Sequence, residues 1–391
     1  MDNPILGISN TELIQKGGIH TANEIYGQPK LWYNTWKLIT ENSVQLLSHL
    51  QNVFEQKDLQ IILTGAGTSA FIGEVLEGPM QKNTKIPTRA VPTTDIVTHP
   101  ELFILENKPT LLISFARSGN SPESVKTVEL MNLLLKNIYH LIITCNPDGE
   151  LAKLSCSNKC FVFVLPPESN DQSLAMTGSF SSMLLAGLII SRFGELSALE
   201  NQISVIHKYG CEFFEKYLLK IKKIADLNFN RAVFLGSGLF SGIARESHLK
   251  LQELTDGKIV CKHDTFLGFR HGPKAVIDDK TLITYLFSNN NYSQKYEIDL
   301  VNSVKNGRSG IYSVGIMEKE LSDLSIDTNI IFSNGSESLD EEFLSVPLIL
   351  FAQLLGFFKS LNLGLKPDNP SEEGIITRVV QNVNLYNYVK D

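Results

Sequence analysis

The sequence is poor in cysteine, in positive charge and in long apolar runs, and each scarcity excludes a class of protein. Its five cysteines are an odd number, and Cys156 and Cys160 lack a second cysteine or histidine pair for a metal site. The formal net charge of -7 disfavours nucleic acid as the main partner. The apolar stretch MLLAGLII is about half a membrane span, and the N-terminus is not a signal peptide. We therefore expect a cytoplasmic protein with reduced thiols and no membrane partner.

The chain contains an internal duplication. Its 391 residues, 43% hydrophobic and 20% charged, are enough for one large or two medium domains. Four pairs of apolar segments recur in the same order, about 170 residues apart. The pairs are 59–77 with 231–248, 108–115 with 280–288, 140–146 with 311–317, and 159–169 with 328–338.

Short apolar strands alternate with helical segments in both halves. This pattern predicts an α/β protein with two tandem, doubly wound parallel-sheet domains. We expect an N-terminal helical segment at 1–45 that packs outside the first domain, and domains at 46–200 and 201–365. The helical segment 198–227 links the halves, and a tail at 366–391, which begins with the turn signal Pro-Asp-Asn-Pro, lies back over the structure.

Ligands of open α/β sheets bind beyond the carboxyl ends of the strands, where two glycine-containing loops lie in the first half. In GAGTSA the glycines allow a tight turn, and Thr68 and Ser69 can cap the next helix; a plain strand-to-helix turn is the alternative. In FARSGNSPES, Ser121 is an N-cap followed by Pro at N1. Ser118, the helix N-terminus and Arg117 would together bind an anion such as a phosphate monoester, or the loop only caps the helix.

A third loop, PPESNDQSLAMTGSFSS, follows the last strand of the first half. Its residues Ser173 and Thr177 could reach a polyol, although a surface loop explains the pattern equally well.

The second half supplies the groups that can titrate. Glu246, Lys250 and Glu253 share one helix face, which suits either a general base beside a cation or a solvated ion-pair surface. His271, before Gly-Pro, is a candidate acid or base near neutral pH, or a structural histidine.

These motifs together resemble the sugar isomerase (SIS) family. GAGTS, the Ser-Gly-x-Ser of residues 118–121 and the duplication carry the resemblance. ARESHLKLQEL and LGFRHGPKAVI are similar to the isomerase half of glucosamine-6-phosphate synthase. The whole chain, including the PDNP tail, resembles the AgaS-type branch, described as tagatose-6-phosphate ketose/aldose isomerases or galactosamine-6-phosphate deaminases.

The resemblance implies roles for individual residues. Thr68, Ser69, Ser118 and Ser121 would bind the phosphate and sugar. Glu253 would move the proton between C1 and C2, beside Lys250. His271 would assist ring opening from a neighbouring subunit, so activity would require a homodimer or a higher homo-oligomer.

The sequence also departs from the synthase. Ala116 and Arg117 stand where the synthase has serine and glutamine, and its C-terminal lysine could correspond to Lys366 or Arg378. We expect no glutamine-hydrolysing domain before the two halves, which argues against glutamine-dependent amination. We expect an isomerase or deaminase of a hexose or hexosamine 6-phosphate that needs no cofactor and no metal. The alternatives are a non-catalytic sugar-phosphate sensor and a deglycase of a phosphorylated sugar-amine adduct.

Overall fold

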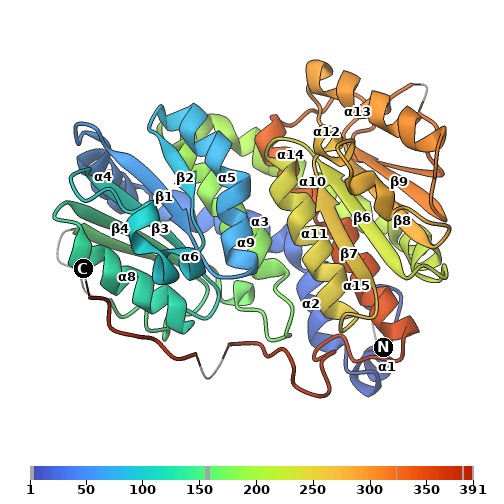
Figure 1. Cartoon of the computed structure of the whole chain (residues 1–391), viewed down its shortest axis with the longest axis horizontal. Coiled ribbons are helices and arrows are strands. Elements are labelled where there is room, and N and C mark those ends of the chain that lie inside the picture. The colour runs from blue at the N-terminus through green and yellow to red at the C-terminus, as the bar shows by residue number, and fades with distance from the viewer. Residues whose placement is uncertain (1–3, 155–158, 323, 381–382, 390–391) are drawn as a thin grey trace. The chain divides into compact units, whose positions relative to one another are not determined.

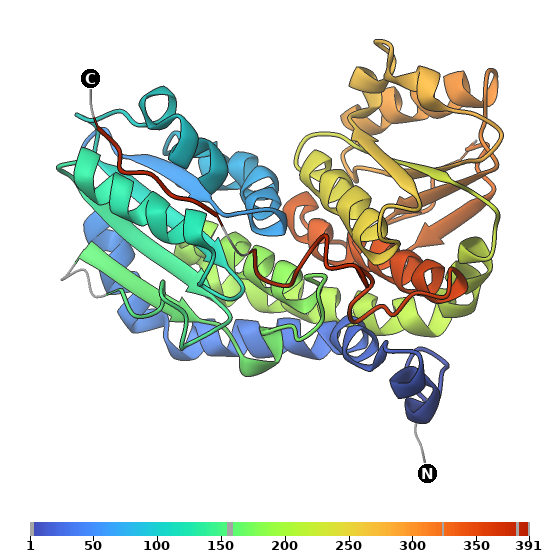
Figure 2. The same ribbon diagram turned by 60° about the horizontal axis from the view of Figure 1, so that its bottom comes forward.

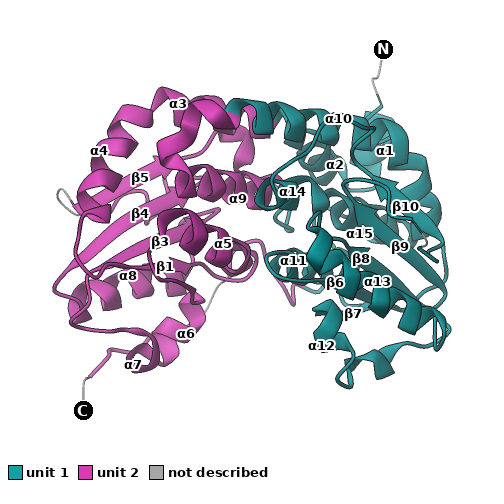
Figure 3. Cartoon of the chain, turned by 90° about the horizontal axis from the view of Figure 1, so that it is seen from above, with its two compact units in different colours: residues 1–30, 172–177, 200–373 teal, residues 31–171, 178–199, 374–391 magenta. Residues whose placement is uncertain are grey.

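The structure is a computed structural model that describes residues 4–154, 159–322, 324–380 and 383–389. Cys156 lies outside the described residues, and the four cysteines among them are free thiols. The chain forms two compact units that are discontinuous in sequence (Figure 3). Unit 1 comprises residues 1–30, 172–177 and 200–373, and unit 2 comprises residues 31–171, 178–199 and 374–391.

Unit 2 is built on a parallel sheet of five strands within its described residues, in the order β2-β1-β3-β4-β5 (Figure 1). The strands are β1 (Gln60–Thr64), β2 (Thr88–Ala90), β3 (Thr110–Ala116), β4 (Ile138–Thr144) and β5 (Cys160–Val164). Both β1 and β3 are buried along their whole length, as the apolar runs of their sequence predict.

Helices cover both faces of this sheet. Ile62, Leu112 and Ile142 point to the face covered by α6 (Thr93–Thr98) and α8 (Pro122–Leu134). The next residue, Leu63, contacts Gly73 of α5 (Thr68–Thr84), so α5 covers the other face. The remaining helical elements in this part of the chain are α3 (Gln28–Glu41), α4 (Ser43–Phe54), α7 (Pro100–Phe103), η2 (Pro167–Ser169), α9 (Gly178–Ser191) and η3 (Phe193–Glu195).

Unit 1 repeats the arrangement with the strand order β10-β9-β8-β6-β7, also parallel. The strands are β6 (Arg231–Gly236), β7 (Val260–Asp264), β8 (Thr281–Leu286), β9 (Tyr312–Met317) and β10 (Thr328–Ile331). One face packs against α12 (Phe266–Phe269) and α13 (Asn291–Lys305). The helices α11 (Phe240–Leu254) and α15 (Leu350–Asn362) pack closely, since a Cβ on Gly356 would lie 2.7 Å from the Leu254 side chain.

The first helices of the chain, α1 (Asn10–Gln15) and α2 (Ile19–Tyr26), belong to unit 1. Asp368 of the PDNP turn fixes α2, because its carboxylate accepts from the Thr21 N–H (2.7 Å) and the Thr21 hydroxyl (2.8 Å). The units thus group the chain differently from the predicted four-part division, which set residues 1–45 apart from both domains. The predicted boundaries themselves stay a prediction.

Apolar helices fill the interior. The remaining elements are η4 (Pro273–Val276), α14 (Glu341–Leu348) and the linking helix α10 (Leu196–Ala225). Residues Glu341–Asn362 are long and apolar enough to cross a membrane, but 94% of the apolar window is buried inside the protein. A bent pair, Gly178–Ser191 with Phe193–Ala225, passes the same test only when counted together, across a 79° bend. All residues of α9 are buried, so its apolar composition serves the core.

Candidate active site

A tight turn after β1 presents Thr68 and Ser69. A Cβ on Gly65 would lie 2.6 Å from the Ser69 backbone, so the turn requires glycine there. Gly67, with φ +56°, is the N-cap of α5. The prediction that Thr68 or Ser69 caps this helix is therefore wrong, because the left-handed glycine begins it one residue earlier. Both residues lie in the first, buried turn of α5.

The predicted phosphate loop, residues 117–121, lies between β3 and α8 and is held by the loop after β4. Gly119 has φ +68°, and a Cβ on Gly149 would lie 2.4 Å from the Ser118 carbonyl oxygen. The Asn146 side chain donates to the same carbonyl at 2.9 Å. Sequence reasoning missed Asn146 and Gly149, although the turn sequence Asn-Pro-Asp-Gly could have indicated them.

The hydroxyl groups of this loop lie at the N-terminus of α8. Ser121 is the N-cap and Pro122 occupies N1, as predicted, but the Ser121 side chain makes no capping hydrogen bond. The Ser118 hydroxyl accepts from the Asn120 N–H at 3.2 Å. Two serines at the positive end of a 13-residue helix form an arrangement suited to an anion.

Arg117 does not point to solvent. Its side chain is buried, and its guanidinium donates to the backbone carbonyl of Arg378 in the C-terminal tail. The Arg378 guanidinium in turn donates to Asn170 and to the Asp171 carbonyl. The other tail candidate, Lys366, forms an exposed ion pair with Glu372 in unit 1. Of the two, Arg378 is therefore the residue that contacts the phosphate loop.

Cys145 follows β4 directly, at the same carboxyl edge of the sheet. Burial raises the pKa of its thiol to about 12, with a smaller opposing effect from Ser169. The thiol thus stays protonated near neutral pH and is a packing residue rather than a nucleophile.

In unit 1, α11 places Lys250 between two carboxylates. Its Nζ lies 2.6 Å from Glu253 and 3.3 Å from Glu246, and the side chains of Lys250 and Glu246 are fully buried. Burial acts to lower the pKa of Lys250, but the two carboxylates outweigh it and raise the pKa above its usual value. The Glu253 side chain keeps 23% exposure. The alternative of a solvated ion-pair face is therefore wrong.

His271 lies in the turn between α12 and η4. It is exposed, and the next residue, Gly272, has φ +114° before Pro273 begins η4. The turn thus fixes the backbone position of His271, while its imidazole ring is accessible to a substrate or to another subunit.

Ser173 and Thr177, the predicted polyol contacts, are buried in unit 1. The Ser173 hydroxyl donates to Glu24 and to the Ala175 carbonyl. The Thr177 carbonyl accepts from the Gln353 side chain at 3.4 Å, directly before α9 begins. These bonds join residues 172–177 to unit 1, so a surface loop does not describe this segment.

Comparisons with known proteins identify the family and the fold of the chain. The SIS domain model matches residues 54–190. The D-galactosamine-6-phosphate deaminase AgaS of Shewanella sp. (strain ANA-3) is 39% identical over 394 residues, which cover 98% of this chain and 96% of the relative. The chain belongs to the AgaS family.

Solved structures related to this AgaS-family chain share its fold along the full length. A structure from Clostridium novyi NT has a TM-score of 0.96 at 41% identity, and covers 99% of this chain and 100% of its own. The tagatose-6-phosphate ketose/aldose isomerase of Escherichia coli has a TM-score of 0.86 at 32% identity, over 95% and 97%. The predicted α/β fold with two parallel sheets is thus confirmed.

Proposed function

We propose that this AgaS-family protein is an amino-sugar 6-phosphate deaminase and isomerase, which converts galactosamine 6-phosphate to tagatose 6-phosphate and ammonia. The observation that carries the proposal is the buried Lys250 at 2.6 Å from the partly exposed Glu253. The Shewanella relative is named a deaminase and the Escherichia coli structure a ketose/aldose isomerase. Both reactions begin with the same proton transfer between C2 and C1.

The phosphate group binds the loop after β3. Ser118 and Ser121 donate hydroxyl hydrogen bonds to it, and the N-terminus of α8 adds its positive end. Thr68 and Ser69, in the first turn of α5, bind the sugar from the neighbouring strand end.

Glu253 and Lys250 of α11 perform the chemistry together with His271, which lies in a turn outside that helix. His271 moves a proton at the ring oxygen and opens the pyranose to the aldehyde. Glu253 removes the C2 proton, and the C2–H electron pair forms the C1–C2 double bond of an enaminol. Lys250, kept protonated by its carboxylate partners, stabilises the negative charge that develops on the C1 oxygen.

Return of the proton to C1 yields a C1 alcohol and a C2 imine. Water adds to C2, the C–N bond breaks, and ammonia leaves the 2-ketose phosphate. A substrate with a hydroxyl group at C2 stops at the ketose, which is the isomerase reaction. The protein therefore needs no separate catalytic group for each activity.

We also propose a homodimer or higher homo-oligomer in which His271 serves a neighbouring subunit. The support is its exposure, together with the exposed apolar residues Val260 on the edge strand β7 and Leu267 on α12. A cytoplasmic location is part of the same proposal and fits the free thiols of the described cysteines.

A substrate panel tests the function. Purified protein is incubated with galactosamine, glucosamine and tagatose 6-phosphates, and ammonia and ketose phosphate are measured separately. We expect ammonia and tagatose 6-phosphate in equal amounts from the galactosamine compound, and slower release from its C4 epimer. Ketose or aldose formation without ammonia would restrict the protein to isomerisation.

Two outcomes would replace the proposal by one of its alternatives. Amine release only from an adduct of a sugar phosphate with an amino acid would identify a deglycase. Tight binding of a sugar phosphate without turnover of any compound would identify a sensor. In such a protein Glu253 and His271 would have no catalytic role.

A further inference from the structure

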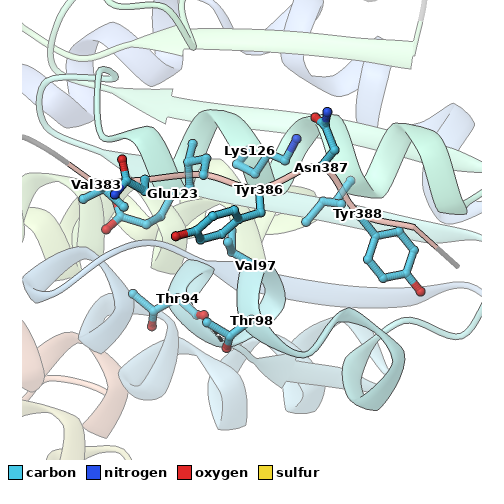
Figure 4. Close-up of a pocket in the computed structure, with 12 residues that line it drawn as sticks. Thr94, Val97, Thr98, Glu123, Lys126, Val383, Tyr386, Asn387 and Tyr388 are labelled. Carbon is cyan, nitrogen blue, oxygen red and sulfur yellow. Dashed lines mark hydrogen bonds between the residues drawn. The ribbon is translucent and has the colours of Figure 1, made fainter. Parts of the chain in front are cut away.

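The C-terminal tail returns to unit 2 after residue 373 and lies along its helices (Figure 2). Residues 383–388 border a cavity of about 500 Å³ together with α6 and α8, where Tyr386 lies near Val97 and Lys126 (Figure 4). The tail thus forms one wall of this cavity.

Burial of apolar side chains contributes only part of what holds the tail in place, because four of its apolar residues are mostly exposed and others, such as Ile376 and Val379, are half-buried. The exposed fractions are 76% for Ile375, 52% for Val380, 80% for Tyr386 and 77% for Val389. At roughly 25 cal/mol per Å² of buried apolar surface, side chains so exposed contribute little binding energy. Polar anchors therefore add to these limited apolar contacts.

Arg378 is the main anchor. Its Nε donates to the Asp171 carbonyl at 3.0 Å and its Nη2 donates to Asn170 Oδ1 at 3.1 Å. Its own carbonyl accepts from the buried guanidinium of Arg117. Charge-assisted bonds of this kind are stronger than neutral ones and are costly to break when buried. A second anchor joins the Tyr388 hydroxyl to Glu101.

Both contact points of Arg378 belong to loops at the carboxyl edge of one sheet. Arg117 directly precedes Ser118 after β3, and Asp171 lies beyond β5. The Asp171 carboxylate also accepts from the Ser179 N–H at 2.9 Å and the Ser179 hydroxyl at 2.5 Å, in the first turn of α9. Arg378 therefore links the phosphate loop to a second loop that is itself fixed.

We infer that Arg117 and Arg378 are positioning residues, and that the docked tail holds the Ser118 loop in its phosphate-binding conformation. This inference rests on the proposed phosphate role of Ser118 and Ser121. Arg117 acts on the phosphate indirectly: it bonds the tail, and the tail fixes the loop. Since coupling is reciprocal, phosphate bound at the loop must also stabilise the docked tail.

The test uses inorganic phosphate and the full-length protein, without turnover. Calorimetry gives the Kd, and hydrogen exchange followed by mass spectrometry reports on residues 116–121 and on the tail. We expect Arg378→Ala to raise the phosphate Kd about tenfold and to speed exchange in residues 116–121. Arg378→Lys keeps the charge but not the bidentate geometry, so its phosphate Kd and exchange rates should lie between those of the wild type and of Arg378→Ala. Lys366→Ala is the matched control, since its exposed ion pair lies in unit 1.

Hydrogen exchange of the wild-type protein with and without phosphate is a second test, and it does not depend on the folding of a variant. Phosphate should slow exchange of the tail amides as well as of residues 116–121. An unchanged Kd in Arg378→Ala, or tail exchange that phosphate leaves unaltered, would overturn the inference. If Ser118→Ala binds phosphate as tightly as the wild type, the proposed phosphate site itself is wrong, which separates the two failures.

Discussion

Lys250 keeps its charge in a fully buried position because two carboxylates of its own helix neutralise it. Glu246 is also fully buried, and its contact at 3.3 Å compensates the charge of the lysine. Glu253 differs in one respect, since its side chain retains 23% exposure. Of the two carboxylates, only Glu253 is accessible, which is why we propose it rather than Glu246 as the base.

Replacing Glu253 with Gln should remove the proposed base while keeping the size and shape of the side chain. We expect turnover of galactosamine 6-phosphate to fall about 10²–10⁴-fold, the usual contribution of a positioned base. The affinity for the sugar phosphate, measured by calorimetry, should change little. Glu246→Gln is the matched comparison, because it removes the other carboxylate beside Lys250. It should lower turnover much less than Glu253→Gln does. Near-normal turnover in Glu253→Gln would show that another group moves the proton.

The same strand–loop–helix element serves different purposes in the two halves. The loop after β3 is a polar loop at the start of α8, whereas donors of the loop after β8 are hydrogen-bonded to the protein's own carboxyl groups. The buried Glu318 accepts from the Asn289 side chain at 2.9 Å and from the Tyr209 hydroxyl at 3.2 Å. The buried Glu297 accepts from the Ser288 N–H at 3.0 Å. These donors, which could bind an anion, are thus already bonded to internal carboxyl groups.

Glu297 should make stability depend on pH. Burial raises the pKa of its carboxyl to about 8, Ser288 opposes this shift, and Glu341 adds to it. The folded state therefore retains a proton that the unfolded state loses above its ordinary pKa of about 4.5. The contribution of this proton to stability is fully present below pH 4.5 and is lost as the pH rises from there through 8.

Thermal unfolding between pH 5 and pH 9 can measure this loss. As the pH rises across this range, the free energy of unfolding of Glu297→Gln should increase relative to that of the wild type by on the order of 2–4 kcal/mol, because the amide cannot ionise. Glu320→Gln, at an exposed position, is the control and should follow the wild-type profile. Parallel profiles for Glu297→Gln and the wild type would contradict the shifted pKa.

Short apolar runs predicted eight of the ten strands described here, and the two that were missed lack such a run. Strands β2 (Thr88–Ala90) and β7 (Val260–Asp264) are edge strands, one with three residues and the other with a polar sequence. The face of Lys250 and Glu253 was predictable because it is local to one helix. The partner of Arg117 was not, since Arg378 lies 261 residues away and only the folded chain brings them together.

At the scale of the whole molecule, the duplication separates the predicted groups. Ser118 and Ser121 belong to unit 2, whereas Lys250, Glu253 and His271 belong to unit 1 (Figure 3). Glu253 is fixed to Lys250 within its own helix, but His271 is exposed in a turn outside α11. A histidine in such a place can serve a neighbouring subunit, as the resemblance to the synthase implies.

Subunit mixing tests whether active sites are shared. Glu253→Gln and His271→Asn should each be nearly inactive, but their mixture should regain about a quarter of the wild-type activity. The fraction follows because half of the dimers are mixed and each has one intact site. Glu253→Gln mixed with Lys250→Met is the control and should stay inactive, since these residues contact each other within one chain. If mixed dimers of the first pair form and remain inactive, His271 acts within its own subunit.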